Sequence, residues 1–234
     1  MKKVAVFVEG QTEQVFASEL VKQIFGHIKV AVEELQLMGK EGSRYVRTIR
    51  SVDTESSTDY FFRIYDCQGG NIESTVKSEI REQFPILINE SFSFIIGIRD
   101  VYPLPDLDML KSMMDRELPS NTMLPIKIFL AVREIEAWFL AEEKHYSLID
   151  ESLTIPHINK IVGFDIMTNS TETINHPSLT LKTIYQSVGK DYKKKKWETE
   201  RTVYCIDYEN LYLNVRKRNE SLNELLICLD GLIS

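Results

Sequence analysis

Residues 4–8 constrain the fold of this chain more than any other stretch. They read Val-Ala-Val-Phe-Val, apolar throughout and without the alternation of polar residues that a half-exposed strand shows. Such a run is typical of a strand that helices cover on both faces. We therefore expect a central strand of an α/β sheet here, with Glu9 at its carboxyl end.

The residues after this run predict a turn into a helix. Gly10 can adopt backbone angles that other residues avoid, Thr12 is a candidate N-cap, and residues 14–26 carry apolar side chains at helical spacing. Ligands bind at the carboxyl ends of strands in open α/β sheets, which makes Glu9 a candidate site residue. The alternative, an acid that favours the start of the next helix, suits Glu13 better.

The rest of the chain alternates predicted strands with helices. Pro85 lies inside one predicted helix and suggests a kink or a break. Apolar residues three apart in 44–53 fit neither a strand nor a long helix, so we interpret that segment as a loop or short element. The other predicted strands are residues 27–38, 59–65, 92–98 and 124–132, and later helices are predicted near 106–118, 177–188, 198–215 and 220–232.

This pattern predicts an α/β fold with a mainly parallel central sheet of about five strands, sandwiched by helices. We expect residues 1–145 to form the α/β domain and residues 146–234 to form a helical C-terminal region packed on it.

Acidic residues stand at the ends of three predicted strands. Glu9 follows the first, Asp100 follows residues 92–98, and Glu134 and Glu136 follow residues 124–132. If the strands at residues 4–8 and 92–98 are neighbours, Glu9 and Asp100 lie about 5 Å apart. That spacing suits one Mg²⁺ with oxygen ligands. Two carboxylates that close repel each other unless a cation lies between them. Glu134 and Glu136 are equally interpretable as helix-start charges.

One basic segment, residues 190–197, has aromatic residues among its lysines. Phosphate neutralisation and base stacking need this combination, and a solvated loop is the other interpretation. The candidate nucleic-acid contacts are Lys193, Lys194, Lys195, Lys196 and Tyr192.

Composition excludes several other classes of function. A net charge of −7 argues against a protein that coats nucleic acid over its whole surface, though not against a local basic groove. The three cysteines and four histidines lack the spacings of disulfide frameworks and zinc sites. There is no Walker loop and no apolar run of about 18 residues. We therefore expect a cytoplasmic protein with no membrane association.

The motifs together resemble a known family. Val-x-Val-Glu-Gly-x-Thr-Glu, a later strand ending in Asp, and Glu-x-Glu-Ala-Trp are similar to the Toprim-like family of small bacterial proteins of uncharacterised function, which are relatives of the OLD-type nucleases. The resemblance covers most of the chain, and only its first and third motifs are specific. The matching residues are Glu9, Gly10, Thr12, Glu13, Asp100, Glu134, Glu136, Ala137 and Trp138, followed by Pro177, Ser178, Leu181, Tyr192 and Lys194.

The resemblance implies a Toprim-like fold and an enzyme dependent on Mg²⁺ (or Mn²⁺) that cleaves phosphodiester bonds in DNA or RNA, that is, a nuclease. In this picture Glu9 acts as general acid/base or metal ligand, Asp100 coordinates the metal, and Glu136 completes the site. The resemblance also implies an ATPase partner protein and a role in defence against phage or mobile DNA.

One position departs from the Toprim pattern. The pattern has Asp-x-Asp at the strand end, and here Tyr102 stands in the second place. Asp106 or Asp108 could supply the missing carboxylate, although both are also typical helix-start residues. Tyr102 therefore favours an alternative function, a degenerate and non-catalytic Toprim module that binds nucleic acid or a partner protein.

Overall fold

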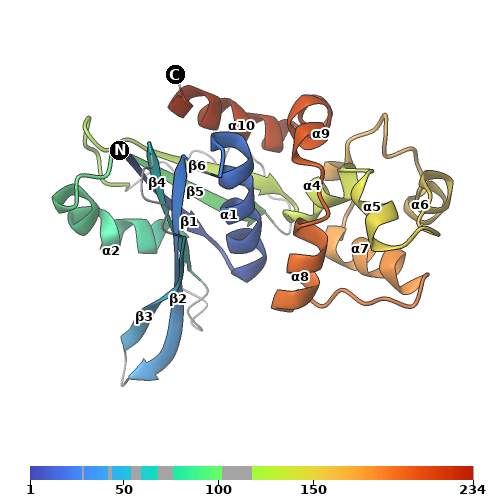
Figure 1. Cartoon of the computed structure of the whole chain (residues 1–234), viewed down its shortest axis with the longest axis horizontal. Helices are drawn as coiled ribbons and strands as arrows, with labels where there is room; N and C mark the ends of the chain where they lie inside the picture. The colour runs from blue at the N-terminus through green and yellow to red at the C-terminus, as the bar shows by residue number, and fades with distance from the viewer. Residues whose placement is uncertain (28, 42–43, 54–58, 68–75, 102–117, 234) are drawn as a thin grey trace. The chain divides into compact units, whose positions relative to one another are not determined.

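A computed structural model describes the chain except residues 28, 42–43, 54–58, 68–75, 102–117 and 234. In these described residues the strands are β1 (Lys2–Val8), β2 (Val30–Glu41), β3 (Arg44–Asp53), β4 (Tyr60–Asp66), β5 (Phe94–Val101) and β6 (Ile126–Val132). They form one six-stranded sheet in the order β3-β2-β4-β1-β5-β6 (Figure 1). The chain divides into two compact units, Met1–Arg99 with Asp106–Phe129, and Asp100–Pro105 with Leu130–Ser234.

β1 is the central strand that the sequence predicts. It pairs in parallel with β4 on one side and with β5 on the other, with Val8 opposite Asp66 and Ile98. All five residues from Val4 to Val8 are buried. Because β2 is also parallel to β4, the predicted mainly parallel α/β sheet is confirmed. The pairing of β1 with β5 also meets the condition under which Glu9 and Asp100 are expected to lie close together.

The interpretation of residues 44–53 as a loop or short element is wrong, because a strand of 10 residues occupies the whole segment. This segment is β3, which runs antiparallel to β2, and β2 itself continues to Glu41, past its predicted end. The pairing steps from Glu34–Ser51 to Leu35–Ile49, so Arg50 is an extra residue in β3. Such a bulge interrupts the period of two that identifies a strand in a sequence, which explains the misleading spacing.

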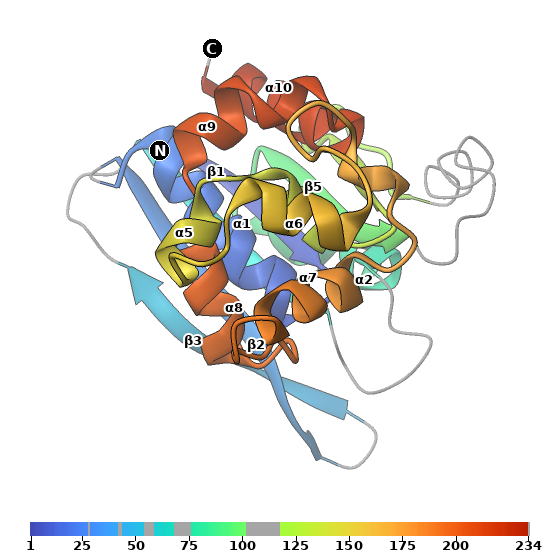
Figure 2. The ribbon, with the colours of Figure 1, turned by 90° about the vertical axis from the view of Figure 1, so that its right-hand side faces the viewer.

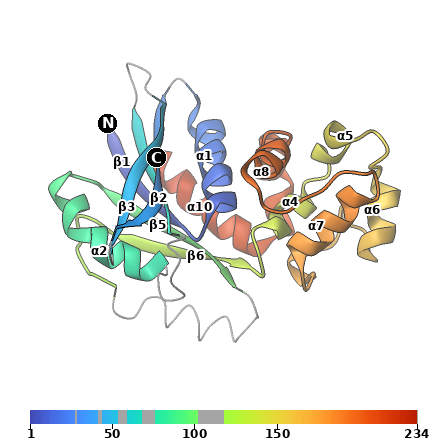
Figure 3. The same cartoon turned by 90° about the horizontal axis from the view of Figure 1, so that it is seen from below.

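Helices α1 (Gln11–Phe25) and α2 (Val76–Asn89) cover opposite faces of this sheet (Figure 3). On one face the ring of Phe25 lies 4.9 Å from that of Phe62 in β4. On the other face Phe7 belongs to the same apolar cluster as the buried side of α2. The alternation of side chains along each strand thus supplies two apolar faces, as a sheet between helices requires.

One predicted detail of these helices is wrong. The N-cap of α1 is Gly10 in an extended conformation, and Thr12 lies inside the helix, where it is buried. Of the kink or break expected at Pro85, the break does not occur, because α2 continues through that residue. The predicted helix at 106–118 lies almost entirely outside the described residues, as do Tyr102, Asp106 and Asp108.

The second unit is helical, as predicted (Figure 2). The predicted helix at 177–188 is confirmed as α7, whereas 198–215 contains two helices because Asp207 caps a new one by accepting a hydrogen bond from the Asn210 backbone. In its described part this unit contains α4 (Glu136–Ala141), α5 (His145–Ile149), α6 (Ile155–Val162), η1 (Thr171–Thr173), α7 (Pro177–Gln186), α8 (Lys196–Val203), α9 (Tyr208–Leu213), η2 (Val215–Lys217) and α10 (Glu220–Ile233).

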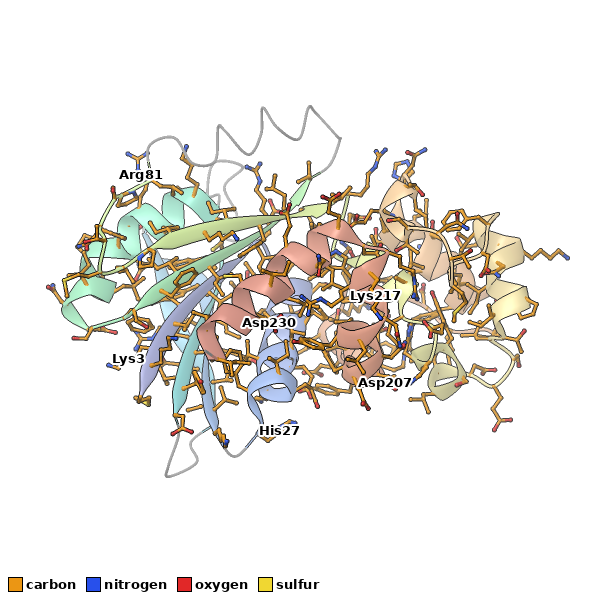
Figure 4. The ribbon with its side chains drawn as sticks, turned by 90° about the horizontal axis from the view of Figure 1, so that it is seen from above. Lys3, His27, Arg81, Asp207, Lys217 and Asp230 are labelled. Atoms are coloured by element: carbon orange, nitrogen blue, oxygen red, sulfur yellow. The ribbon has the colours of Figure 1, made fainter. Side chains whose placement is uncertain are left out.

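The helical unit begins earlier in the chain than the expected boundary after residue 145. α4 contacts α7 and η1, and Trp138 is fully buried, with its indole N–H donating to Ser221 Oγ at 2.9 Å. Asp230, labelled in Figure 4, joins α10 to α9 by accepting a 2.6 Å hydrogen bond from the Tyr212 hydroxyl. None of the described helices is long and apolar enough to cross a membrane.

Candidate functional site

Glu9 lies directly after β1, at the carboxyl edge of the sheet in the first unit. The pairing of Val8 with Ile98 places Glu9 beside Arg99, whose Nε is 3.9 Å from Glu9 Oε1. The Glu9 side chain is 43% exposed. A partly exposed carboxylate in this position can accept a proton or ligate a cation, as the resemblance requires of it.

Asp100 holds the start of α4 in the second unit. Its Oδ1 accepts a 2.9 Å hydrogen bond from the backbone N–H of Ile135, the residue between Glu134 and Glu136. A second bond runs from Val101 N–H to Arg133 O at 3.1 Å. The ends of β5 and β6 are therefore joined, and Asp100 fixes the backbone that carries the two glutamates.

Glu134 and Glu136 share one counter-ion. Lys194 Nζ lies 3.2 Å from Glu134 Oε1 and 3.0 Å from Glu136 Oε1. Glu134 also accepts hydrogen bonds from the backbone N–H and hydroxyl of Ser178, and Glu136 accepts one from the Tyr192 hydroxyl at 3.0 Å. We call the set Asp100, Glu134, Glu136, Ser178, Tyr192 and Lys194 the carboxylate cluster.

The two glutamates of the cluster differ in electrostatic environment. Burial raises the pKa of the Glu136 carboxyl above its ordinary value, and the charge of Glu134 adds to the rise, against the opposing effect of Lys194. Burial also acts on Glu134, but the Ser178 N–H and Lys194 outweigh it and hold the pKa of that carboxyl below its ordinary value. Glu134 is therefore the stable anion, and Glu136 is the carboxyl suited to exchange a proton.

Glu136 retains an unused acceptor atom. Its Oε2 is buried and, within the described residues, has no hydrogen-bond partner. Buried carboxylate oxygens are rarely left in this state, and each exception points to strain, chemistry or a missing ligand. Arg133, which precedes Glu134, and Lys194, a member of the cluster, have φ values of 69° and 55°. Strained residues of this kind gather at functional sites and cost about 1–3 kcal/mol each.

The donor atoms suit a hard divalent cation. Carboxylate oxygens, such as those of Asp100 and Glu136, are the ligands that Mg²⁺ takes in proteins, and Oε2 of Glu136 offers one open position. The ammonium of Lys194 already supplies positive charge between the glutamates. In the described part of the chain no group of three or more His, Cys, Asp or Glu side chains is arranged to hold a metal. A cation bound to Glu136 would lie close to the Lys194 ammonium, which already pairs with that carboxylate.

The basic segment does not act as one surface. Tyr192 is only 2% exposed, so the prediction that its ring stacks on bases does not fit this structure. Lys194 turns inward to the cluster, while Lys193 and Lys196 form ion pairs with Asp191 and Glu200. Lys195 is exposed.

The structure unites residues from separate parts of the resemblance. Glu134 and Glu136, Ser178, and Tyr192 with Lys194 come from three segments of the chain and meet in one cluster. Glu134 and Ser178 were not assigned a role in the predicted site, although both lie within the matching motifs. Reading the weaker motif fragments as parts of one site would have found them.

Comparison with known proteins gives one match. The model of a family described as a domain of unknown function (DUF4276) matches residues 8–212, a range that contains Glu9 and the whole carboxylate cluster. No curated protein and no solved structure matches the chain.

Proposed function

The chain belongs to the DUF4276 family of domains of unknown function, and we propose that it is a Toprim-type, Mg²⁺-dependent enzyme that cleaves phosphodiester bonds in nucleic acid. One observation supports this proposal above the others. Asp100, near the end of β5, holds the backbone at the start of α4, and Glu136 in the first turn of that helix keeps a buried oxygen with no partner among the described residues.

The acidic residues and Lys194 have distinct parts in the proposed reaction. Asp100 and Glu136 would hold the metal, which when bound supplies Lewis-acid polarisation of the phosphate. Glu136, whose pKa is raised, would give up its proton when the metal binds, whereas Glu134 stays charged and keeps the Lys194 ammonium in place. Glu9 is the acid that the resemblance adds from the end of β1, as metal ligand or general acid/base.

The resemblance extends the proposal to the biological setting. It implies that the enzyme acts with an ATPase partner protein and takes part in defence against phage or mobile DNA. The lysines at 193, 195 and 196 would contact the phosphate backbone of DNA or RNA.

A second candidate function rests on a different observation. Lys194 neutralises Glu134 and Glu136, and Tyr192 donates to Glu136, so the cluster is largely satisfied by the chain itself. A satisfied ionic network can serve structure alone. This supports the alternative of a non-catalytic Toprim module that binds nucleic acid or a partner protein.

A nuclease assay separates the two candidates. Plasmid, single-stranded DNA and RNA are incubated with the wild type, Glu9→Gln, Glu136→Gln and the control Glu209→Gln, an exposed glutamate of α9. The enzyme proposal expects cleavage that requires Mg²⁺ or Mn²⁺ and falls at least about 100-fold in both site variants. The melting temperature of the wild type should also rise with metal. Cleavage unchanged in Glu136→Gln, or no response of any kind to metal, would reject it.

A further inference from the structure

Helix α8 presents two large aromatic rings to solvent. Trp197 is 57% exposed and Tyr204, the residue after the helix, is 63% exposed. Positions seven apart lie two turns apart on one side of a helix, while the other side of α8 buries Thr199, Thr202 and Val203. Exposed aromatic residues that share one face mark an interaction site more often than a structural one.

A fixed cation lies between the exposed ring of Trp197 and the buried ring of Tyr185 in α7. The guanidinium carbon of Arg201 is 5.4 Å from the centre of the Trp197 ring and 5.5 Å from that of Tyr185. The guanidinium is anchored by a 2.6 Å hydrogen bond to the backbone oxygen of Asp191. Arg201 thus restrains the indole by a cation–π contact. Because the ring is already held in place, it loses little conformational entropy when a ligand stacks on its exposed face.

The charge around the Trp197 ring favours an anionic partner. Lys193 and Lys196 are exposed but paired with Asp191 and Glu200. Lys195 is exposed at the start of the helix, and Arg201 lies beside the ring. Positive charge next to open aromatic rings is the combination that binds single-stranded nucleic acid, because each base offers a face for stacking and each phosphate a negative charge.

We propose that the face of α8 formed by Trp197, Arg201 and Tyr204, together with Lys195, binds single-stranded nucleic acid by stacking bases on its aromatic rings. This inference rests on the proposed function, since it names the form of nucleic acid that the enzyme engages. A duplex is disfavoured because its bases are already stacked on each other and do not present a free face. An apolar protein partner is disfavoured by the cations beside the rings.

The two tryptophans of the chain make the test direct. Trp138 is fully buried, so a change of fluorescence on stacking reports on Trp197. We would titrate the wild type with a 20-residue oligothymidylate and with a duplex of equal length, in a chelator of divalent metals so that no cleavage occurs. We expect quenching by the single strand, with an affinity at least tenfold above that for the duplex.

Three variants complete the experiment, with binding followed by anisotropy of a labelled oligonucleotide. Trp197→Ala should weaken binding about 5- to 100-fold, the range for loss of one stacked base, and Lys195→Ala should weaken it and reduce its dependence on salt. Leu179→Ala, which removes an exposed apolar side chain of α7, is the control and should bind as the wild type does. No quenching, equal binding of the duplex, or unchanged binding by Trp197→Ala would overturn the inference.

Its failure can be told apart from failure of the proposed function. Hydrolysis of bis(p-nitrophenyl) phosphate, a small phosphodiester, does not need the α8 face. That activity should be lost in Glu136→Gln and retained in Trp197→Ala. Hydrolysis without oligonucleotide binding would reject the inference alone, and oligonucleotide binding without any metal-dependent hydrolysis would reject the enzyme alone.

Discussion

Lys194 Nζ and Glu136 Oε1 form an ion pair at 3.0 Å whose two partners differ in exposure. The carboxylate is fully buried, and the lysine side chain is 38% exposed. The lysine can therefore move toward solvent, whereas the carboxylate cannot. A phosphate could attract the ammonium away from Glu136, and a competing cation could displace it. The buried Glu136 carboxylate would then have to gain a proton or bind a metal.

Lys194→Met should destabilise the fold. Breaking a buried ion pair costs about 3–5 kcal/mol. Because Lys194 is 38% exposed and its charge is screened by solvent, we expect a smaller loss of about 1–2 kcal/mol in the free energy of unfolding. Urea denaturation at pH 7 measures it. Lys193→Met, which breaks only an exposed pair with Asp191, should match the wild type. Equal stability of the two variants would contradict a counter-ion role for Lys194.

Glu136→Gln should change the pH dependence of stability. The folded pKa of Glu136 is raised above its unfolded value, so its contribution is fully present below the unfolded pKa of about 4.5 and is lost as pH rises through the folded pKa. Glutamine mimics the protonated form at every pH. The stability of the variant relative to the wild type should therefore increase from pH 5 to pH 8. Thermal unfolding of both proteins at pH 5 and at pH 8 measures it. A difference independent of pH would show that Glu136 does not titrate in this range.

Asp100 allows the structural and chemical roles of one carboxylate to be separated. Asp100→Asn keeps an oxygen that can accept from the Ile135 N–H, so the free energy of unfolding should stay close to that of the wild type. Asp100→Ala loses the acceptor and should cost about 1 kcal/mol, as for other lost acceptors at a helix start. Both variants should lose the rise in melting temperature with Mg²⁺. An undiminished rise in Asp100→Asn would exclude Asp100 as a metal ligand.

Glu142 should matter for stability rather than for activity. This buried carboxylate accepts hydrogen bonds from the backbone N–H groups of Lys144 and His145 and from the Asn210 amide. Glu142→Gln should cost about 2–3 kcal/mol in the free energy of unfolding, because hydrogen bonds to a charged group are lost or weakened. Glu151→Gln, at an exposed position, is the control for the same chemical change.

The stability that Glu142 contributes should depend on pH in the opposite sense to the contribution of Glu136. Burial opposes the charge of Glu142, but its hydrogen bond with His145 and the other donors lower its pKa overall. A lowered pKa contributes stability above the unfolded value of about 4.5 that is lost as pH falls through the folded pKa. The difference between wild type and Glu142→Gln should therefore shrink in acid. A difference that grows as pH falls would contradict this assignment.

The sequence predicts those parts of the fold in which local pattern and tertiary environment agree. Residues 4–8 are apolar on both faces, and β1 is covered on both faces. The sequence does not indicate β3, because the bulge at Arg50 breaks the alternation, and this bulge is a property of its pairing with β2. The N-cap of α1 is Gly10, which has no side chain to accept a capping hydrogen bond and so carries no N-cap signal of the kind that Thr12 does.

The sequence predicts where the acidic residues of the candidate site lie better than it predicts which side chains they contact. Glu9 and Glu134 follow β1 and β6 at the predicted strand ends, whereas β5 runs past its predicted end at residue 98 and includes Asp100. The sequence pattern predicts Tyr192 and Lys194 to be surface residues, because an aromatic residue among lysines has the same pattern whether it faces solvent or a buried carboxylate. Only the folded chain shows that both turn to Glu136.

The assembly of the carboxylate cluster from four separate segments limits how this chain can be shortened. A fragment ending at residue 145 would keep every strand of the sheet and both glutamates, yet it would lack Ser178, Tyr192 and Lys194. Glu134 and Glu136 would then face each other with none of these partners. Any piece of the chain used alone must therefore extend to Lys194 or beyond to keep the partners of both glutamates.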